Sequence, residues 1–451
     1  TLQSDAAVLN FGADSDVSLT HVADTGLLIN GASAIQFRDS ALAINSSADG
    51  QLDIIADTQL EITTPTLELN SDAQIIAIGA DGDVTVTHEA DTGLKMKAAS
   101  GFELNLQTGD TSVESGNVLG KITFNAPSES SGSDAILDGA AIEAISEATF
   151  SSSVNSTALV FKTNTSAAAT ERFRIASDGS LSTTTAGTSN VRFGVNAGNS
   201  IASGGNYNTV IGDEAGTAIT TGDNNTLIGT FSGDAIIASS GNTAVGSYSM
   251  TSMTHGADNV AIGTSALDVD TKGNYSVAVG RNALGTQNFT TSTDTYNVAV
   301  GYAAGTAVTE GQQNTLIGGL AGDALTHADK NTAVGMQALT TDTLGHRSTA
   351  IGQNALKVQN FTTSTDSYNV AVGFEAGSAV TTGTENTLIG AEAGDALTDA
   401  DKNVAIGKSA LTADTLGSRT VAVGQGALAA QNFTTATDTY NTAVGHFAGL
   451  S

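Results

Sequence analysis

The stretch "NVAVGYAAGTAVTEGQQNTLIGGLAGDALTHADKNTAVG" (residues 297–335) contains one pentapeptide three times at a constant spacing, with starts at Asn297, Asn314 and Asn331. Its pattern is Asn, then Val or Thr, then Ala or Leu, then Val or Ile, then Gly. A repeat of this length is too short for a pair of helices and predicts a β structure that returns once per unit. Alignment on the glycine gives fifteen units, which start at Asn190, Asn208, Asn225, Asn242, Asn259, Ser276, Asn297, Asn314, Asn331, Ser348, Asn369, Asn386, Asn403, Thr420 and Asn441.

Each unit predicts a strand followed by a tight turn. Positions two and four of the pentapeptide share one face of a strand, and β-branched residues there suit a pleated, packed surface. The fifth-position glycine permits a turn with positive φ, and the small residue at position eight indicates a second layer close by. Val at Gly373 should therefore cost roughly 1–3 kcal/mol. The turn glycines of the last nine units are Gly301, Gly318, Gly335, Gly352, Gly373, Gly390, Gly407, Gly424 and Gly445.

The units themselves repeat in groups of four, and we call this longer period the supercycle. The spacings between units run 17, 17, 17 and 21 from Asn297 to Asn369, and again from Asn369 to Asn441. The longest unit carries nearly the same insert each time: "QNFTTSTDTY" (287–296), "QNFTTSTDSY" (359–368) and "QNFTTATDTY" (431–440). With strands about 4.8 Å apart, the inserts would recur about every 19 Å on one side.

The inserts are candidates for receptor contact, because they gather aromatic side chains in a region that otherwise has few. The alternative is that these side chains cover the extra loop or touch a neighbouring chain. The candidate residues are Phe289, Tyr296, Phe361, Tyr368, Phe433 and Tyr440.

Composition restricts the classes of partner. The 16 basic and 46 acidic residues give a net charge of −30, which disfavours nucleic acid and anionic membranes and makes divalent cations plausible companions. No apolar run is long enough to span a membrane. There is no Trp and no Cys, and aromatic residues make up 5% of the chain. Large side chains are thus too few for a thick core, which favours a thin core of stacked strands.

The motif Asn-x-Ala-[Val/Ile]-Gly-x-x-Ala resembles the head repeat of trimeric autotransporter adhesins of the YadA type. The resemblance covers the repeat region and implies a left-handed parallel β-roll of about fifteen coils, assembled as a homotrimer. Heads of that family commonly have shorter coils, so the longer unit of this chain implies an extra loop per coil. Such rolls occur in adhesins and in phage fibres alike.

The N-terminal region is a different β-rich segment with its own duplication. "FGADSDVSLTHVADTGLLIN" (11–30) matches "IGADGDVTVTHEADTGLKMK" (78–97). Its short one-sided strands predict a shaft in which three chains wind around a common axis. His21 and His88 occupy equivalent places, and in a trimer three imidazoles around the axis could hold a metal ion. The alternative is that each histidine is a polar turn residue.

The middle segment resembles the connector of many phage tail-fibre proteins. It reads "LGKITFNAPSESSGSDAILDGAAIEAISEATFSSSVNSTALVFKTNTSAAATERFRIASDGSL" (119–181). The family pattern is G-x-I-x-F, then AAI-x-A, then L-x-F-x-T, then ER-x-R-I-x-S-x-G. The duplicated N-terminal blocks also resemble those of tail fibres from aquatic phages. The matching connector residues are Gly120, Ile122, Phe124, Ala140, Ala141, Ile142, Ala144, Leu159, Phe161, Thr163, Glu171, Arg172, Arg174, Ile175, Ser177 and Gly179.

No catalytic signature is visible: the chain has no nucleophile elbow, zinc helix motif or Walker loop. We expect a protein without enzymatic activity or cofactor. The predicted fold is all-β, an elongated homotrimeric fibre with an N-terminal shaft (1–115), a connector (116–188) and a β-roll (189–451). The expected function is a phage tail fibre in the virion tail that binds other tail proteins and a host surface glycan or protein. The alternatives are a bacterial cell-surface adhesin, an extracellular filament subunit or a glycan depolymerase.

Overall fold

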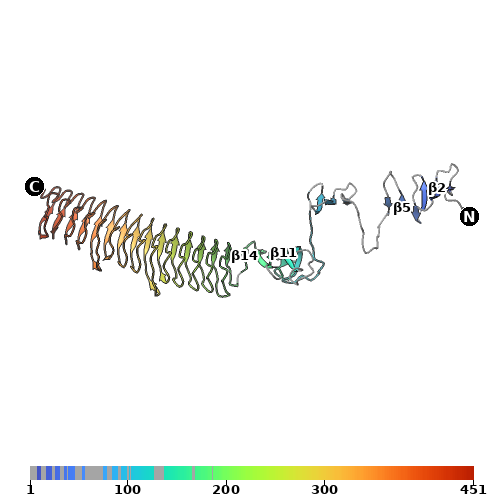
Figure 1. Ribbon diagram of the computed structural model, residues 1–451, viewed down its shortest axis with the longest axis horizontal. Coiled ribbons are helices and arrows are strands. Elements are labelled where there is room, and N and C mark those ends of the chain that lie inside the picture. The colour runs from blue at the N-terminus through green and yellow to red at the C-terminus, as the bar shows by residue number, and fades with distance from the viewer. Residues whose placement is uncertain are drawn as a thin grey trace. The chain divides into compact units, whose positions relative to one another are not determined.

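A computed structural model describes short strands between residues 8 and 98, residue 101, and residues 103–125, 137–164, 168–184 and 186–450. These residues form strands, turns and loops without any helix, as the predicted all-β class requires. The chain separates into two compact units, Thr1–Asn105 and Leu106–Ser451. Figure 1 follows the chain from the labelled strands of the first unit to the stacked coils at its C-terminal end.

The described strands of the first unit form three antiparallel meanders of three strands each. The two duplicated blocks contribute to the first and the third meander at equivalent positions, and the middle meander has the same strand order. Five apolar side chains described here, Val8, Leu9, Ile54, Ile55 and Met96, are each 44–49% exposed. The strands are β1 (Val8–Phe11), β2 (Val17–Val22), β3 (Gly26–Asn30), β4 (Ile35–Phe37), β5 (Asp39–Asn45), β6 (Asp53–Ile55), β7 (Ile75–Ile78), β8 (Val84–Glu89) and β9 (Gly93–Ala98).

The second unit opens with a five-stranded antiparallel meander, which we call the connector sheet. Its central strands bury one face, at Ala141, Ala158 and Val160. The other face carries large apolar side chains that stay partly exposed. The strands are β10 (Val118–Asn125), β11 (Asp138–Ser146), β12 (Thr157–Thr163), β13 (Thr170–Ile175) and β14 (Leu181–Thr183).

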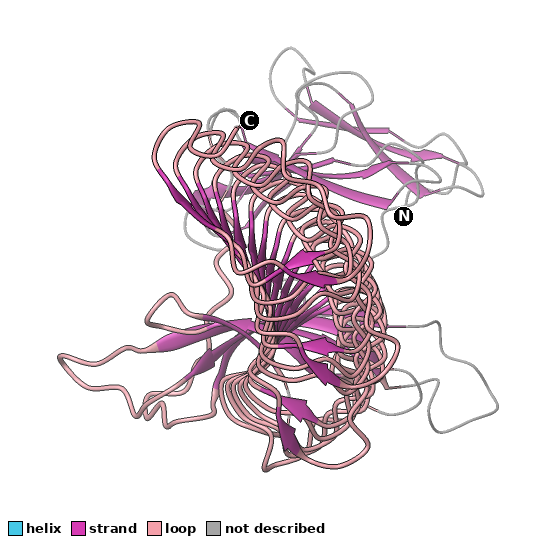
Figure 2. Ribbon diagram, turned by 90° about the vertical axis from the view of Figure 1, so that its left-hand side faces the viewer, coloured by secondary structure: helices cyan, strands magenta, loops and turns pink. Residues whose placement is uncertain are grey.

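The rest of the second unit is a parallel β-solenoid of fifteen turns, and Figure 2 shows its strands stacked as one row of arrows. Each strand pairs in register with the equivalent residues of the next coil. The strands are β15 (Val191–Phe193), β16 (Thr209–Ile211), β17 (Thr226–Ile228), β18 (Thr243–Val245), β19 (Val260–Ile262), β21 (Val277–Val279), β23 (Val298–Val300), β24 (Thr315–Ile317), β25 (Thr332–Val334), β27 (Thr349–Ile351), β29 (Val370–Val372), β30 (Thr387–Ile389), β31 (Val404–Ile406), β33 (Val421–Val423) and β35 (Thr442–Val444).

Between the first and last turns of the solenoid, the strands bury their middle residue and turn the residues on either side of it outward. Ala371 is completely buried, whereas its neighbours Val370 and Val372 are only half-buried. Positions two and four therefore share a face, as predicted. Within one chain, however, that face is the outside of the solenoid, because the inward-facing middle residue is the one that packs in the interior, as Ala in most strands and as Leu in Leu316 and Leu388.

The interior keeps its volume by exchanging large and small residues between coils. In one coil, Leu388 and Leu397 fill the interior and the ninth position is Gly394. In the next coil the ninth position is Leu411 and the third is Ala405. A Cβ atom on Gly394 would lie 2.8 Å from a methyl group of each leucine, so the two leucines exclude a ninth-position side chain. The same exclusion acts between coils at Gly377, where a Cβ atom would lie 2.6 Å from Leu388 of the next coil and 3.0 Å from Leu356 of the coil before.

The fifth-position glycines form the turns that the sequence predicts. Gly373 has a φ of +145°, and a Cβ atom there would lie 2.4 Å from the carbonyl oxygen of Gly390 in the next coil. Gly445 has a φ of +131°, but the atom nearest to such a Cβ, Ala448 Cβ, is 3.8 Å away. The glycine thus satisfies two separate demands, a backbone conformation and a close approach between coils.

The opening asparagines form a buried ladder that runs from coil to coil. Asn386 Nδ2 donates to the carbonyl oxygen of Ala400 at 2.8 Å, and its Oδ1 accepts the backbone N–H of Asn403 at 3.0 Å. Each such asparagine therefore satisfies a turn carbonyl in its own coil and a backbone N–H in the next. Buried backbone groups that would otherwise lack partners are paired in this way.

Candidate functional site

The three inserts are candidate functional sites, since each adds a short parallel ladder outside the main row of strands. The ladder joins the insert to the coil before it, and Figure 2 shows these pairs as separate short arrows. Every copy begins with a Gly in the preceding coil and ends with a Thr-Asp pair in the insert. The paired strands are β20 (Gly273–Asn274) with β22 (Thr293–Asp294), β26 (Gly345–His346) with β28 (Thr365–Asp366), and β32 (Gly417–Ser418) with β34 (Thr437–Asp438).

A buried polar network anchors each insert where the asparagine ladder is interrupted. In the second insert, Gln359 Nε2 donates to Asp342 Oδ2 at 2.6 Å and to Ser348 Oγ at 2.8 Å. Gln359 Oε1 accepts from Asn369 Nδ2 at 2.9 Å, which joins the interrupted ladder to the next coil. Ser348 stands where other units have the ladder asparagine, and the amide of Gln359 takes the place of that asparagine amide in the ladder. The same bonds recur with Asp270 and Gln287, and with Asp414 and Gln431.

The phenylalanines of the inserts belong to this anchor. Phe289 and Phe361 are 4% and 5% exposed, and Phe433 is half-buried. The backbone N–H of Phe361 donates to Asp342 Oδ1 at 3.0 Å, and its carbonyl oxygen accepts from Thr343 Oγ1 at 2.9 Å. In this structure, Phe289 and Phe361 therefore lie beneath the insert instead of on its surface.

The tyrosines of the inserts lie at the surface, where Tyr296, Tyr368 and Tyr440 are 52%, 51% and 70% exposed. Arg347 Nε donates to Asp366 Oδ1 at 2.9 Å, and its guanidinium carbon lies 5.7 Å from the centre of the Tyr368 ring. Loss of hydration by itself would raise the pKa of Asp366. The hydrogen bond from Arg347 and its positive charge outweigh this effect, so that the pKa of Asp366 is lowered. The insert thus presents a fixed aromatic ring beside an ionised carboxylate.

The other two inserts keep this geometry with one substitution. Arg419 lies beside Asp438 and Tyr440 in the same way, with 3.0 Å from Nε to the carboxylate. In the first insert the arginine is replaced by Tyr275, whose ring stacks on Tyr296 with centroids 5.3 Å apart. An aromatic or guanidinium plane therefore covers part of the insert tyrosine in every copy.

The residue that directly precedes Arg347, Tyr275 or Arg419 in the chain connects the insert to the neighbouring coil. His346 Nδ1 accepts the backbone N–H of Asp329 at 2.9 Å, and its Nε2 lies 2.8 Å from Ser364 Oγ. Asn274 and Ser418 accept the equivalent backbone N–H groups in the other two copies. Since three residue types fill one role, His346 serves as a hydrogen-bond acceptor in the scaffold.

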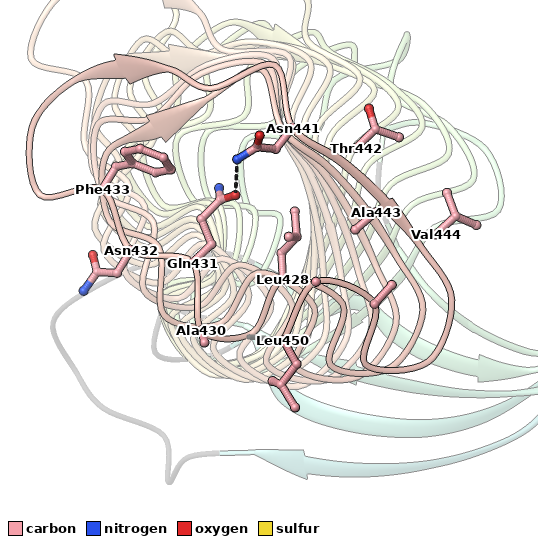
Figure 3. A pocket seen from close by; sticks show the side chains of 12 residues that line it. Leu428, Ala430, Gln431, Asn432, Phe433, Asn441, Thr442, Ala443, Val444 and Leu450 are labelled. Carbon is pink, nitrogen blue, oxygen red and sulfur yellow. Dashed lines mark hydrogen bonds between the residues drawn. The ribbon is translucent and has the colours of Figure 1, made fainter.

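The last turn forms a concavity that exposes the inside of a coil (Figure 3). It is lined by Leu428, Phe433 and Ala443, among others, and Asn441 Nδ2 donates to Gln431 Oε1 at 2.8 Å across it. Their counterparts in earlier turns are buried core and ladder residues. The concavity is therefore a cross-section of the stack, and its lining repeats the anchor already described.

His21 and His88 lie on equivalent central strands, β2 and β8, opposite Leu27 and Leu94. Both are strand residues and not turn residues, which corrects the alternative drawn from the sequence. Their side chains lie outside the described part of the structure. Among the residues that are described, no group of three or more His, Asp or Glu side chains is placed to hold a metal ion.

Sequence reasoning missed the polar anchor and the charged partner of each tyrosine. A signal for the anchor was present: an Asp stands one ordinary coil before each insert Gln, and Ser or Thr replaces the ladder asparagine between them. The Arg–Asp–Tyr arrangement had no such signal, because its first residue is not constant: Tyr275 stands in the first copy where Arg347 and Arg419 stand in the others.

Within the described residues, no helix has the length and apolarity needed to cross a membrane. Comparison of the chain with protein-family models, curated proteins and solved structures found no match.

Proposed function

We propose that this protein is a homotrimeric fibre that attaches to a cell surface, as a phage tail fibre does, and that its role is structural and adhesive instead of catalytic. The outer face of the solenoid sheet is the observation that carries the proposal. Its fifteen strands present two rows of outward side chains, all of them Val, Ile, Thr or Phe. At about 4.8 Å per coil, this uncharged face is about 67 Å long.

The exposure of this face supports contact between chains. Ile262, Ile317, Ile351 and Ile389 are 38–41% exposed, and Phe193 is 50% exposed. The fourth position of the unit forms a continuous row of Val, Ile or Phe along this face. Extended apolar surfaces are rare on monomers and are typical of interaction surfaces. A chain of net charge −30 repels its own copies, so an uncharged face is where copies can meet. Closed rotational symmetry would let three equivalent faces cover one another.

The inserts support the adhesive part of the proposal. Each chain presents the aromatic ring and carboxylate three times, as Tyr296 with Asp294, Tyr368 with Asp366 and Tyr440 with Asp438. Exposed aromatic rings can stack on sugar rings, and carboxylates can accept hydrogen bonds from hydroxyl groups. A trimer would offer nine such groups, so that weak contacts with a repetitive surface glycan add up through effective concentration.

Sedimentation of matched variants tests the trimer. Ile351 on the outer sheet face and Val358 on another side of the same coil are 38% and 37% exposed. We expect the wild type to sediment as a trimer, Ile351→Glu to weaken the trimer by desolvating a charge at the interface, and Val358→Glu to leave it intact. A folded wild-type monomer, or equal behaviour of the two variants, would contradict the proposal.

A binding assay on whole bacterial cells or their surface glycans tests adhesion. Replacing Tyr296, Tyr368 and Tyr440 together with Ser should lower attachment at least about tenfold while the trimer persists. The matched control replaces Tyr207 and Tyr248, which are exposed tyrosines outside the inserts. If the insert variant attaches as well as the wild type, the receptor site does not lie on the inserts.

A further inference from the structure

We infer that the exposed face of the connector sheet is a second contact between copies of this chain, and that it sets the axial register of the trimer. The inference rests on the proposed trimer and adds a residue-level site to it. A register contact is needed because the solenoid face repeats itself along its length.

The exposed face of the connector sheet is apolar at its alternate positions. Ile122 pairs with Ile142, which pairs with Phe161, and Phe161 pairs with Phe173 across β10 to β13. The rings of Phe161 and Phe173 have centroids 5.8 Å apart. Four strands in a row thus place a large apolar side chain on the same face, as one side of a packed interface requires.

Exposure is concentrated on this face of the sheet. Phe124 and Leu181 are 57% and 59% exposed, and Ile122 and Leu159 are 41% and 40% exposed. Ala158 and Val160, which alternate with Leu159 along β12, are completely buried on the opposite face. The chain therefore buries one face at its central strands and leaves most of the more apolar face exposed, with Leu106 lying over that face only at Gly120.

A second copy of this chain is the partner that fits this face. The cross-strand partners around Ile122, Phe124 and Leu159 are apolar residues, so a like face meets no unpaired charge. On a chain of net charge −30 such uncharged sheet faces are uncommon, and the solenoid face is another. Three copies can cover their apolar faces mutually without a partner of different chemistry.

The two faces are also linked along the chain. β14 ends at Thr183 and β15 starts at Val191, so that only the short segment 184–190 joins the connector sheet to the solenoid. A segment of this length spans at most about 25 Å. Copies held together along their solenoids therefore bring their connector sheets within reach of one another at a high effective concentration.

The repetitive solenoid face cannot define register by itself. A shift by one supercycle places Val298 and Val300 where Val370 and Val372 were, and Thr315 where Thr387 was. The rows then match almost as well as before, and only the overlap at the ends is lost. The connector face has no such repeat, since its large side chains differ in size and spacing, and so it can pack in one register alone.

Crosslinking of the full chain tests this inference. The chain has no cysteine, so Thr315→Cys and Thr387→Cys each introduce a unique thiol on the outer solenoid face. Chains with one or the other substitution are assembled together and treated with a bismaleimide shorter than the supercycle's rise of roughly 19 Å. In the correct register, links join equal positions, whereas a shift by one supercycle joins the thiol at position 315 to the thiol at position 387.

The decisive comparison introduces Phe124→Ser with Leu181→Ser into both cysteine chains. These side chains are more than half exposed in the single chain, so its own fold should persist, which circular dichroism checks. We expect links between equal positions to fall at least fivefold, because mixed links appear or trimers dissociate. The control, Tyr207→Ser with Tyr440→Ser, removes side chains of similar exposure elsewhere and should leave the link pattern unchanged.

The outcomes separate the two proposals. A monomeric wild type overturns the trimer and this inference together. A trimeric wild type whose connector variant keeps only equal-position links at full yield overturns this inference alone. A connector variant with mixed links, or with a lost trimer and a retained fold, supports it.

Discussion

The solenoid and the connector sheet solve the same problem in opposite ways. Each solenoid strand is three residues long and buries at most one side chain, yet Leu316, Leu356 and Leu388 are completely buried. The connector sheet has strands of up to nine residues, yet Phe124 and Leu181 remain more than half exposed. Short strands closed into a coil protect their interior better than long strands in an open sheet.

The difference comes from where the partner surface lies. In the solenoid, each coil folds its turns over its own strand, and the next coil covers what remains, so that burial is a nearest-neighbour effect. An open meander has two faces and covers only one of them with its own chain. We therefore expect defects in the solenoid to act on the single chain, and defects on the open face of the sheet to act on assembly.

The largest expected effect is at the coil-to-coil glycine. Gly373→Val combines a disfavoured φ with a clash against the backbone of the next coil, so its cost should rise from the roughly 1–3 kcal/mol expected for the conformation alone to roughly 4 kcal/mol or more. Gly445→Val, where that clash is absent, should cost only roughly 1–3 kcal/mol. Ser364→Val in an insert should change stability by less than about 0.5 kcal/mol. Denaturant unfolding measures all three, and equal costs at the two glycines would rule out close approach as a cause.

The next effect concerns the buried anchor of an insert. Asp342→Ala leaves Gln359 Nε2 and the backbone N–H groups of Phe361 and Gly345 without their acceptor, and should cost roughly 2–4 kcal/mol. Asp366→Ala breaks an exposed pair with Arg347 and should cost less than about 1 kcal/mol. Thermal unfolding distinguishes them, and similar losses would show that the buried carboxylate has no special role.

A smaller effect should follow from the exchange of volume inside a coil. Ala350→Leu places a leucine against Leu356 in a full interior and should cost about 1–3 kcal/mol. Adding Leu356→Gly reproduces the combination found at Leu388 and Gly394 and should recover part of that loss. If the double variant loses more unfolding free energy than the two single variants lose together, the two positions do not share one space.

The smallest effect is a dependence on pH. Burial raises the pKa of Asp395 above its ordinary 3.8, so the folded chain binds this proton more tightly than the unfolded chain. Stability from this group is present below pH 3.8 and is lost as the pH rises through the raised value. Asp395→Asn should therefore melt slightly higher than the wild type at pH 7 and no higher at pH 3. Asp213→Asn, an exposed residue with the same change of charge, is the control.

The repeat was sufficient to predict the coil, because its signals are local. Asn, a β-branched residue, Gly and a small residue at constant spacing predict a strand and a turn without reference to any distant residue, and register follows when equal units stack. The turn glycines could be assigned for the same reason. The supercycle was equally plain, since it is a property of spacing alone.

What lies inside and what lies outside was decided only by the tertiary structure. Alternation predicts that Val370 and Val372 share a face, but only the width of the interior shows that Ala371 is the residue turned inward. Phe361 looked like a surface residue because aromatic residues are scarce, and the structure places it beneath the insert, bonded to Asp342 from the coil before. Arg347 likewise reaches Tyr368 from the coil before. The sequence did not mark this contact, because Tyr275 takes the place of the arginine in the first copy.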